Sequence, residues 1–484
     1  MKLNNPELLR SQCLINGEWC DALSGKREAV INPATGAELA SIPLVSEEET
    51  QQAIAAAQRA QNDWKQLTAK QRSALLLAWA DKVLAAQEDL AQLMTAEQGK
   101  SLAEARGEVA YAASFITWFA EEAKRVDGAV LQAPQASQRL VVVKQPIGVC
   151  AAITPWNFPA AMITRKVAPA LAAGCAIIVK PAEQTPLTAL ALAKLAQDAG
   201  IPAGVLQVVT GEAAQVGKVL CDSPVVRKLS FTGSTEVGRI LMAQCAPSIK
   251  KLSLELGGNA PVIVFDDANL DAAVAGIMAS KFRNSGQTCV CANRIYVQDG
   301  IYERLVEKLV AAVEQLKVGD GSQEGTTQGP LIDSDAVAKV QSHIDDALIK
   351  GAQIATGGQP HALGGTFFQP TVVTGVTQKM RFAKEETFGP VAPLFRFHDE
   401  AEAIAMANDT EFGLAAYLFT QNAARQWRVP EALEYGMVGI NTGLISNEVA
   451  PFGGVKQSGL GREGSRYGIE EYLELKYLCI DVSR

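Results

Sequence analysis

The chain has 484 residues, of which 48% are hydrophobic and 20% charged, a composition typical of folded proteins with a large core. At roughly 150 residues per domain, this length predicts about three structural units. The balance of 44 Lys and Arg against 52 Asp and Glu gives a net charge of −8, which argues against a nucleic-acid-binding surface.

No targeting or membrane segment is expected. Residues 1–20 contain Lys2, Arg10 and Glu18 and lack the apolar core of a signal peptide. The uncharged stretch 145–164 contains three prolines and Asn157, which favour turns over a transmembrane helix. Nine scattered cysteines, an odd number, indicate a reducing compartment, so we expect a cytoplasmic protein. With only three histidines and no cysteine near them, no metal site is expected.

The first third of the chain is predicted to begin with a strand, continue with helices and end with another strand. Residues 13–19 are predicted to form a short strand, and residues 46–126 are helical in pattern. Two capping boxes support helix starts, Ser46 with Glu49 and Thr68 with Gln71. Residues 140–143 then predict a strand.

From residue 148 onward, strands alternate with helices. Strands are predicted at 149–153, 175–179, 205–209, 227–231 and 252–255, with helices at 160–172 and 187–199 among them. A second series has strands at 261–265 and 294–297 and helices at 272–284 and 301–316. This order predicts a doubly wound parallel sheet followed by a second α/β domain. The C-terminal strand 473–482 is predicted to pair with residues 140–143 or with another subunit.

Several segments carry residues suited to chemistry, and each also has a structural explanation. Cys289 lies in a predicted loop, where a thiol can be an accessible nucleophile or an inert packed side chain. Glu255 ends an apolar strand and precedes two glycines, so its carboxylate could act as a desolvated general base or could simply cap the end of the strand. Gly233 and Gly238 lie between a strand and a helix, where a phosphate can approach, although such turns are also routine. Lys180 and Glu183 follow a strand end, at the place where Rossmann-like sites bind ribose.

Seven motifs occur in one order along the chain. They are TPWNFP at 154–159, KPAE at 180–183, FTGS at 231–234, ELGG at 255–258, GQTC at 286–289, ETFGP at 386–390 and PFGG at 451–454. This set resembles the aldehyde dehydrogenase superfamily over essentially the whole chain. Residues 282–284 (FRN), 289–291 (CVC) and 443–446 (GLIS) look most similar to the succinate-semialdehyde dehydrogenases and their glutarate-semialdehyde relatives.

The resemblance implies a mechanism. Cys289 would attack the aldehyde, and the Asn157 side chain with the Cys289 backbone N–H would hold the oxyanion. Hydride transfer to nicotinamide would leave a thioester, which Glu255 would hydrolyse by activating water. The presence of all three residues argues against a non-catalytic binding protein of the same fold, and Glu255 argues against transfer of the acyl group to coenzyme A.

The resemblance also implies a cofactor site and a three-part fold. The cofactor residues would be Trp156, Lys180, Pro181, Ala182, Glu183, Gly233, Ser234, Leu256, Glu386 and Phe388. Glu183 would accept from ribose hydroxyls and repel a 2′-phosphate, so NAD is expected in preference to NADP, which remains an alternative. A Rossmann-type cofactor domain would comprise residues 1–126 and 148–256, an α/β catalytic domain residues 257–450, and oligomerisation strands residues 127–147 and 470–484.

Substrate choice is expected to depend on Arg165, Arg283 and Ser446. In the similar subfamily, matching residues form a pocket for the distal carboxylate of a semialdehyde, whereas each arginine could instead pair with a local acid. The spacing of Cys289 and Cys291 allows a regulatory disulfide or simple packing. The family further implies a homodimer or homotetramer. We therefore expect oxidation of succinate semialdehyde, with glutarate semialdehyde as the alternative substrate.

Overall fold

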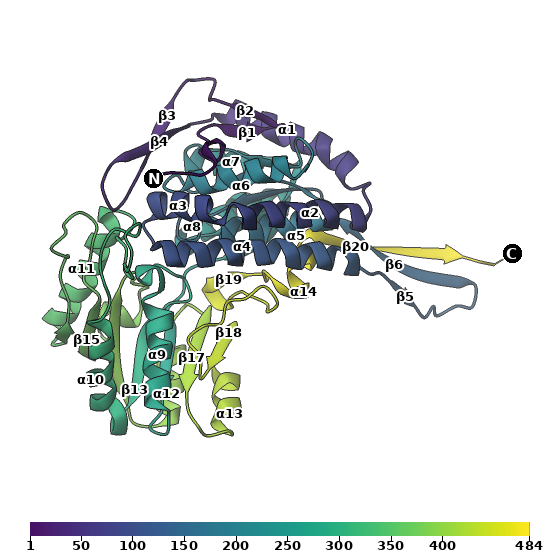
Figure 1. Ribbon diagram of the computed structural model, residues 1–484. Helices are drawn as coiled ribbons and strands as arrows, with labels where there is room; N and C mark the ends of the chain where they lie inside the picture. The colour runs from purple at the N-terminus through teal and green to yellow at the C-terminus, as the bar shows by residue number, and fades with distance from the viewer. Residues whose placement is uncertain (484) are drawn as a thin grey trace.

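A computed structural model of the protein describes residues 1–483 and contains two large sheets and a projecting arm (Figure 1). The first sheet has eight strands in the order β19-β11-β10-β7-β8-β9-β1-β2. Its parallel centre consists of β7 (Val149–Ile153), β8 (Ala176–Lys180), β9 (Leu206–Val208), β10 (Val226–Thr232) and β11 (Lys251–Glu255). The antiparallel edges are β1 (Cys13–Ile15), β2 (Glu18–Cys20) and β19 (Gly459–Leu460). The predicted doubly wound parallel sheet is therefore confirmed.

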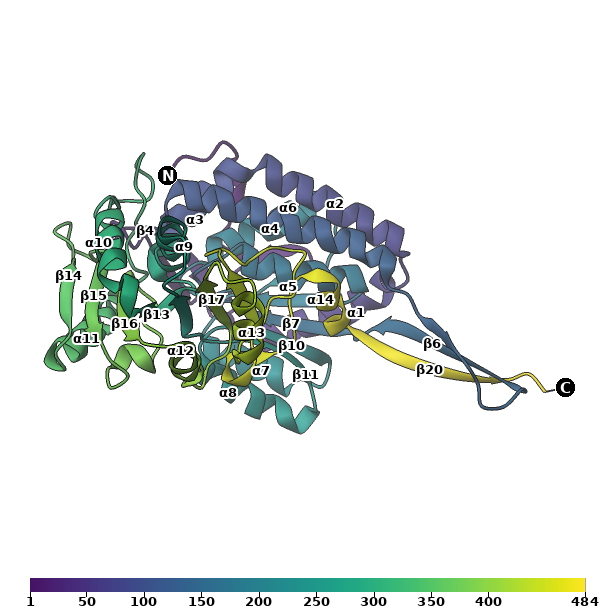
Figure 2. The same cartoon turned by 90° about the horizontal axis from the view of Figure 1, so that it is seen from below.

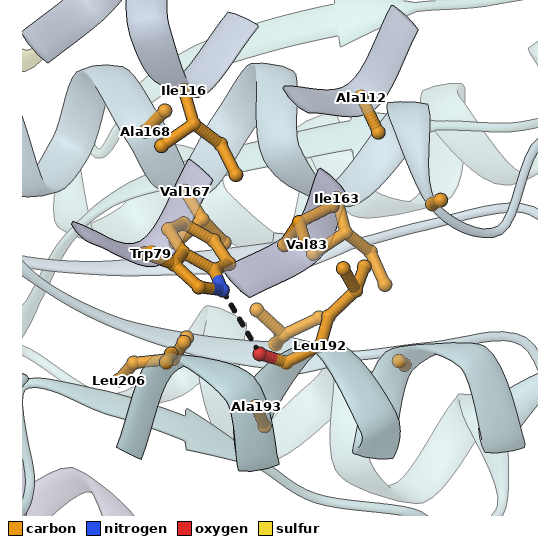
Figure 3. Packing of buried hydrophobic residues seen from close by; sticks show 14 of the residues in the cluster. Trp79, Val83, Ala112, Ile116, Ile163, Val167, Ala168, Leu192, Ala193 and Leu206 are labelled. Carbon is orange, nitrogen blue, oxygen red and sulfur yellow. Dashed lines mark hydrogen bonds between the residues drawn. The ribbon is translucent and has the colours of Figure 1, made fainter. Parts of the chain in front are cut away.

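Eight helices accompany this sheet in the described chain. They are α1 (Glu47–Trp64), α2 (Ala69–Ala85), α3 (Gln87–Gln98), α4 (Leu102–Glu122), α5 (Ala161–Ala173), α6 (Pro186–Asp198), α7 (Ala213–Asp222) and α8 (Thr235–Cys245). The capping boxes predicted at Ser46 and Thr68 are present at the starts of α1 and α2. Trp79 of α2 is fully buried among apolar residues of α4, α5 and α6, and its indole N–H donates to the backbone carbonyl of Leu192 at 3.1 Å (Figure 3). This packing fixes α5, which carries residues of the candidate site.

The second sheet has seven strands in the order β14-β15-β16-β13-β12-β17-β18. The strands are β12 (Ala260–Val264), β13 (Ala292–Gln298), β14 (Gln353–Thr356), β15 (Thr371–Val376), β16 (Val391–Phe397), β17 (Ala415–Phe419) and β18 (Met437–Ile440), of which only β14 is antiparallel to its neighbour. The accompanying helices are α9 (Leu270–Lys281), α10 (Tyr302–Val313), α11 (Ser334–Ile349), α12 (Glu400–Asn408) and α13 (Arg425–Ala432). The chain then returns to the first sheet through β19 and the short helix α14 (Ser465–Gly468).

The arm is a three-stranded sheet that projects away from both large sheets (Figures 1 and 2). It consists of β5 (Ala129–Leu131), β6 (Gln138–Pro146) and β20 (Leu473–Asp481). The antiparallel register pairs Leu473 with Pro146 and Asp481 with Gln138, so the predicted pairing of the C-terminal strand with residues 140–143 is confirmed.

Two local predictions are wrong, each for a stereochemical reason, and one hairpin was missed. The single strand expected at 13–19 is a hairpin, because Asn16 and Gly17 adopt positive φ angles of 52° and 81° and reverse the chain. The helix expected at 272–284 ends at Lys281, since Asn284 and Ser285 are in the left-handed region. The hairpin β3 (Arg27–Ile31) and β4 (Glu38–Pro43) was not predicted, because its strands are largely exposed and lack a continuous apolar pattern.

No helix among residues 1–483 is long and apolar enough to cross a membrane.

Candidate active site

The candidate site lies at the carboxyl ends of the central strands of the first sheet. In a parallel sheet these ends share one edge, so the segments after β7, β8, β10 and β11 meet there. The loop before β13 approaches from the second sheet. A cavity of about 280 Å³ at this edge is lined by both Asn157 and Cys289.

Cys289 is placed by a tight loop that follows α9. The left-handed conformations of Asn284 and Ser285 turn the chain after α9, and the Tyr417 hydroxyl anchors the far side by donating to the Val290 carbonyl at 2.8 Å. The thiol is half-buried, and burial raises the pKa of Cys289 to about 12, an effect that the nearby Arg165 guanidinium opposes. The resting thiol is therefore protonated at neutral pH.

Asn157 is held in the loop between β7 and α5. Its side-chain amide donates to the Gln287 carbonyl at 3.1 Å, so it is attached to the loop that carries the cysteine. Its own backbone carbonyl accepts from Lys100 Nζ at 2.8 Å and from the Asn284 side chain at 3.0 Å. Because an amide has two N–H hydrogens, one stays available for an oxyanion beside Cys289.

Glu255 ends β11 in a buried position without hydrogen-bond partners. The residue is 2% exposed, and neither carboxylate oxygen has a partner within the described chain. Burial raises the pKa of Glu255 well above its usual range, and the neighbouring Glu463 adds to this rise. A Cβ at Gly453 would lie 2.9 Å from a Glu255 carboxylate oxygen, so the glycine leaves room for this carboxyl group. A carboxyl with a raised pKa is suited to accept a proton from water.

Arg165 and Lys166 of α5 form a buried ionic network. Arg165 Nε donates to the Glu463 carboxylate, and Lys166 Nζ donates to the other Glu463 oxygen at 2.6 Å and to Thr232 Oγ1 at 2.5 Å. The guanidinium of Arg165 also lies 4.0 Å from the Phe452 ring centre. One of its terminal nitrogens, Nη2, is buried without an acceptor. Arg165 therefore pairs with a local acid and still has a donor to offer a ligand.

The other two expected substrate residues, Arg283 and Ser446, lie outside the α-helices and strands. Arg283 begins the 3-10 turn Arg283–Gly286, is partly exposed, and its guanidinium lies 4.8 Å from the Phe158 ring centre. Ser446 is partly exposed in the segment after β18. No described hydrogen bond joins either side chain to Cys289.

The cavity is lined by six of the ten residues expected to bind the cofactor. Its lining includes Trp156, Gly233, Ser234, Leu256, Glu386 and Phe388, and the Trp156 and Phe388 rings meet edge to face with centres 5.5 Å apart. Glu386 accepts from the Gly258 N–H at 3.1 Å; burial raises the pKa of Glu386 to about 7, and Lys339 opposes this rise. Aromatic walls, a glycine-containing helix start and a carboxylate in one elongated cavity fit a dinucleotide.

A second groove of about 320 Å³ continues from this cavity, because Ile332 and Asp333 line both. Glu183 lines the second groove together with Glu28 of β3 and forms an ion pair with buried Lys180. Burial and then the charge of Glu183 raise the pKa of Glu28, which shows that the two carboxylates are close enough to interact. Pro181 and Ala182 are buried beside these residues and line neither cavity.

Cys291 is buried and faces the backbone. Its Sγ donates to the Lys281 carbonyl at 3.5 Å, and burial raises its pKa. The side chain is therefore packed against the end of α9.

The comparisons with known proteins agree with this geometry. The profile described as "Aldehyde dehydrogenase family" matches residues 19–478. The chain belongs to the aldehyde dehydrogenase family. It is 65% identical over 480 residues to "Succinate-semialdehyde dehydrogenase [NADP(+)] GabD" of Escherichia coli (strain K12), covering 99% of this chain and 100% of that protein. It is 64% identical over 482 residues to "Glutarate-semialdehyde dehydrogenase" of Pseudomonas putida, covering 100% of both.

Comparison with solved structures also shows the aldehyde dehydrogenase fold. The structure described as "Crystal structure of E. coli NADP dependent enzyme" superposes with a TM-score of 0.99 at 64% identity, covering 99% of this chain and 100% of that one. The protein is therefore an oxidoreductase of the NAD(P)-dependent aldehyde dehydrogenase type.

Sequence analysis missed four polar residues of this aldehyde dehydrogenase's site. Lys166 carried a signal, since it lies beside Arg165 in the mostly apolar stretch that became α5. Lys100, Lys339 and Glu463 carried none, because each lies in an ordinary polar context and reaches the site only through the fold.

Proposed function

We propose that the protein oxidises a short aldehyde whose far end carries a carboxylate, with succinate semialdehyde as the preferred substrate. The observation that carries this proposal is the unpartnered Nη2 of buried Arg165, whose charge acts on the Cys289 thiol. A buried guanidinium N–H without an acceptor is costly, and a substrate carboxylate would remove that cost. Arg283 and Ser446 would complete the pocket. The names of the relatives at 65% and 64% identity support the same substrate class.

The reaction would begin when the Cys289 thiol loses its proton to solvent and its Sγ attacks the aldehyde carbon, giving a thiohemiacetal oxyanion. The Asn157 amide and the Cys289 backbone N–H would hold the oxyanion, which supplies electrostatic stabilisation without a metal. When bound, oxidised NAD(P) would supply the hydride acceptor, and the residues that line the cavity, Trp156 and Phe388 among them, would hold it. Collapse of the oxyanion, with loss of the aldehyde hydrogen as hydride to that acceptor, would leave a thioester on Cys289. Glu255 then takes a proton from water, which attacks the thioester and releases the carboxylic acid.

We propose NAD as the preferred nucleotide, although the E. coli relative is named for NADP(+). Glu183 and Glu28 line the same groove, so a 2′-phosphate there would meet two carboxylates. The positive charge of Lys180 does not fully offset the two carboxylates, because Lys180 is already paired with Glu183. NADP remains the alternative nucleotide.

The remaining assignments are proposals of the same kind. Residues 1–126 and 148–256 would form the cofactor domain, residues 257–450 the catalytic domain, and residues 127–147 and 470–484 the oligomerisation strands. Apolar side chains exposed on the arm, including Val130, Leu475, Tyr477 and Ile480, support assembly into a homodimer or homotetramer. We place the protein in the cytoplasm. The packing of Cys291 against Lys281 favours a structural role over a disulfide with Cys289.

The test is a kcat/KM panel of purified protein with succinate semialdehyde, glutarate semialdehyde, butyraldehyde and betaine aldehyde, each with NAD and with NADP and without coenzyme A. We expect the two carboxylate-bearing aldehydes to react far faster than butyraldehyde. Equal rates for charged and uncharged aldehydes would overturn the substrate class. A higher kcat/KM for glutarate semialdehyde than for succinate semialdehyde would select glutarate semialdehyde as the substrate. Failure to oxidise any aldehyde would favour a non-catalytic binding protein of the same fold.

A further inference from the structure

A second buried donor, the Tyr111 hydroxyl, lies near Arg165 and close enough to Cys289 to interact with it. Tyr111 of α4 packs its ring edge to face against Phe115, with ring centres 4.8 Å apart. The Arg165 guanidinium lies 5.9 Å from the same Phe115 ring. Tyr111 and Arg165 therefore converge on Phe115 from two neighbouring helices, and neither residue lines the cofactor cavity.

The Tyr111 hydroxyl is buried and has no hydrogen-bond partner in the described chain. Native proteins satisfy nearly all buried hydroxyls, so an exception beside a reactive thiol needs an explanation. Burial raises the pKa of Tyr111, with Arg165 and Arg283 lowering it and Glu463 and Cys289 raising it. The hydroxyl is thus surrounded by the charged groups of the candidate substrate pocket and stays protonated, as a donor must.

A groove beside α4 passes close to the backbone of Tyr111. This groove, of about 670 Å³, follows the outer face of α4 and is lined by Ala110, Ser114, Trp118 and Glu448. Ser114 Oγ donates to the Tyr111 carbonyl at 2.8 Å and to the Glu448 carboxylate at 3.3 Å. The Ser114 hydrogen bond places the Tyr111 backbone one helical turn from this groove, although the Tyr111 side chain is not part of its lining. Glu448, which does line the groove, follows the expected substrate residue Ser446 by two positions in the sequence.

We propose that the Tyr111 hydroxyl donates a hydrogen bond to the distal anionic group of the substrate and determines specificity together with Arg165. The two unsatisfied donors, a neutral hydroxyl and a guanidinium N–H, would share one acceptor group of a carboxylate-bearing aldehyde. This inference rests on the proposed function, since it assumes an anionic substrate. It adds a residue that neither the sequence motifs nor the spacing around Cys289 identified.

The experiment compares wild type with Tyr111→Phe, which keeps the ring and its packing on Phe115 and removes only the hydroxyl. For succinate semialdehyde we expect KM and the inhibition constant of succinate to rise roughly ten- to a hundredfold, the size of a lost hydrogen bond to a charged group, with kcat changed little. Butyraldehyde kinetics should stay unchanged, because that substrate offers no anion. Tyr111→Gln, which restores an N–H donor, should recover part of the loss.

Tyr417→Phe is the matched control. Its hydroxyl holds the Val290 carbonyl beside the nucleophile, so its loss should lower turnover of both substrates alike. An unchanged KM in Tyr111→Phe, or an equal loss with both substrates, overturns the role of Tyr111 while the semialdehyde assignment stands, provided that wild type still prefers the charged aldehyde. Equal activity of the wild-type enzyme on the charged and the uncharged aldehyde overturns both the role of Tyr111 and the semialdehyde assignment.

Discussion

Lys100 Nζ donates a hydrogen bond of 2.8 Å to the backbone carbonyl of Asn157, and the same ammonium group forms a buried ion pair with Glu108. Glu108 in turn accepts from the backbone N–H groups of Ala160 and Ala161 at 2.9 and 3.2 Å. The pair therefore holds both ends of the short loop that presents the Asn157 amide to the thiol. Precise placement of an oxyanion donor matters because small displacements cost rate.

The first prediction concerns this pair. Lys100→Met should destabilise the protein by about 3–5 kcal/mol, because both side chains are 1% exposed and Glu108 would be left as an unpaired buried charge. Thermal unfolding should show the loss, and kcat should fall for every aldehyde because Asn157 is less well held. Adding Glu108→Gln, which removes the charge and keeps an acceptor for Ala160 and Ala161, should restore part of the stability. A single variant that melts like wild type would contradict the role of the pair.

The second prediction follows from the raised pKa of Cys289. With the folded thiol titrating near pH 12, the thiolate fraction should rise about tenfold per pH unit between pH 7 and 9 without reaching a plateau. Iodoacetamide labelling of the free enzyme, followed by mass spectrometry of the Cys289 peptide, measures this directly. Cys289→Ala provides the background and should also abolish turnover while nucleotide binding persists. A labelling rate that levels off below pH 8 would show that burial does not control this thiol.

The third prediction separates the two halves of the reaction. Glu255→Gln should slow hydrolysis of the thioester more than its formation, because only hydrolysis needs a proton taken from water. Rapid mixing should then show a burst of NADH followed by slow turnover, with intact protein carrying the mass of the acyl group. Absence of both the burst and the acylated protein would assign Glu255 a role before the thioester.

The sequence predicted the parts of the fold that depend on local pattern. The alternation of apolar strands and helices from residue 148 identified the parallel sheet, and two capping boxes located helix starts at Ser46 and Thr68. It did not predict the Asn16-Gly17 reversal as a turn, although this dipeptide is a strong hairpin signal. The family resemblance, and not periodicity, supplied the roles of Cys289, Glu255 and Asn157.

Contacts between distant segments were beyond sequence reasoning. Glu463 reaches Arg165 across 298 positions, and Lys100 reaches the Asn157 carbonyl across 57. Such a pair depends on how two elements pack, and its acidic or basic member looks like any surface charge in the sequence. For that reason the sequence offered Arg165 as a candidate substrate residue, while its partner Glu463 was not identified.

The last prediction concerns the nucleotide. Glu183→Ser removes one carboxylate from the groove that Glu28 shares, and it also frees Lys180 from its ion pair, so it should raise kcat/KM for NADP relative to NAD by about tenfold or more. Glu28→Gln should shift the ratio in the same direction by less, because it leaves the Lys180 pair intact, and the double variant should shift it furthest. Since the repulsion is electrostatic and the carboxylates are partly exposed to solvent, added salt should narrow the wild-type ratio and affect the double variant little.

Glu431→Gln, which removes an exposed carboxylate on α13, is the matched control and should leave the ratio unchanged. A wild-type enzyme with equal kcat/KM for both nucleotides would overturn the NAD preference, whereas a strong preference that survives in the double variant would show that other groups in the cleft enforce it.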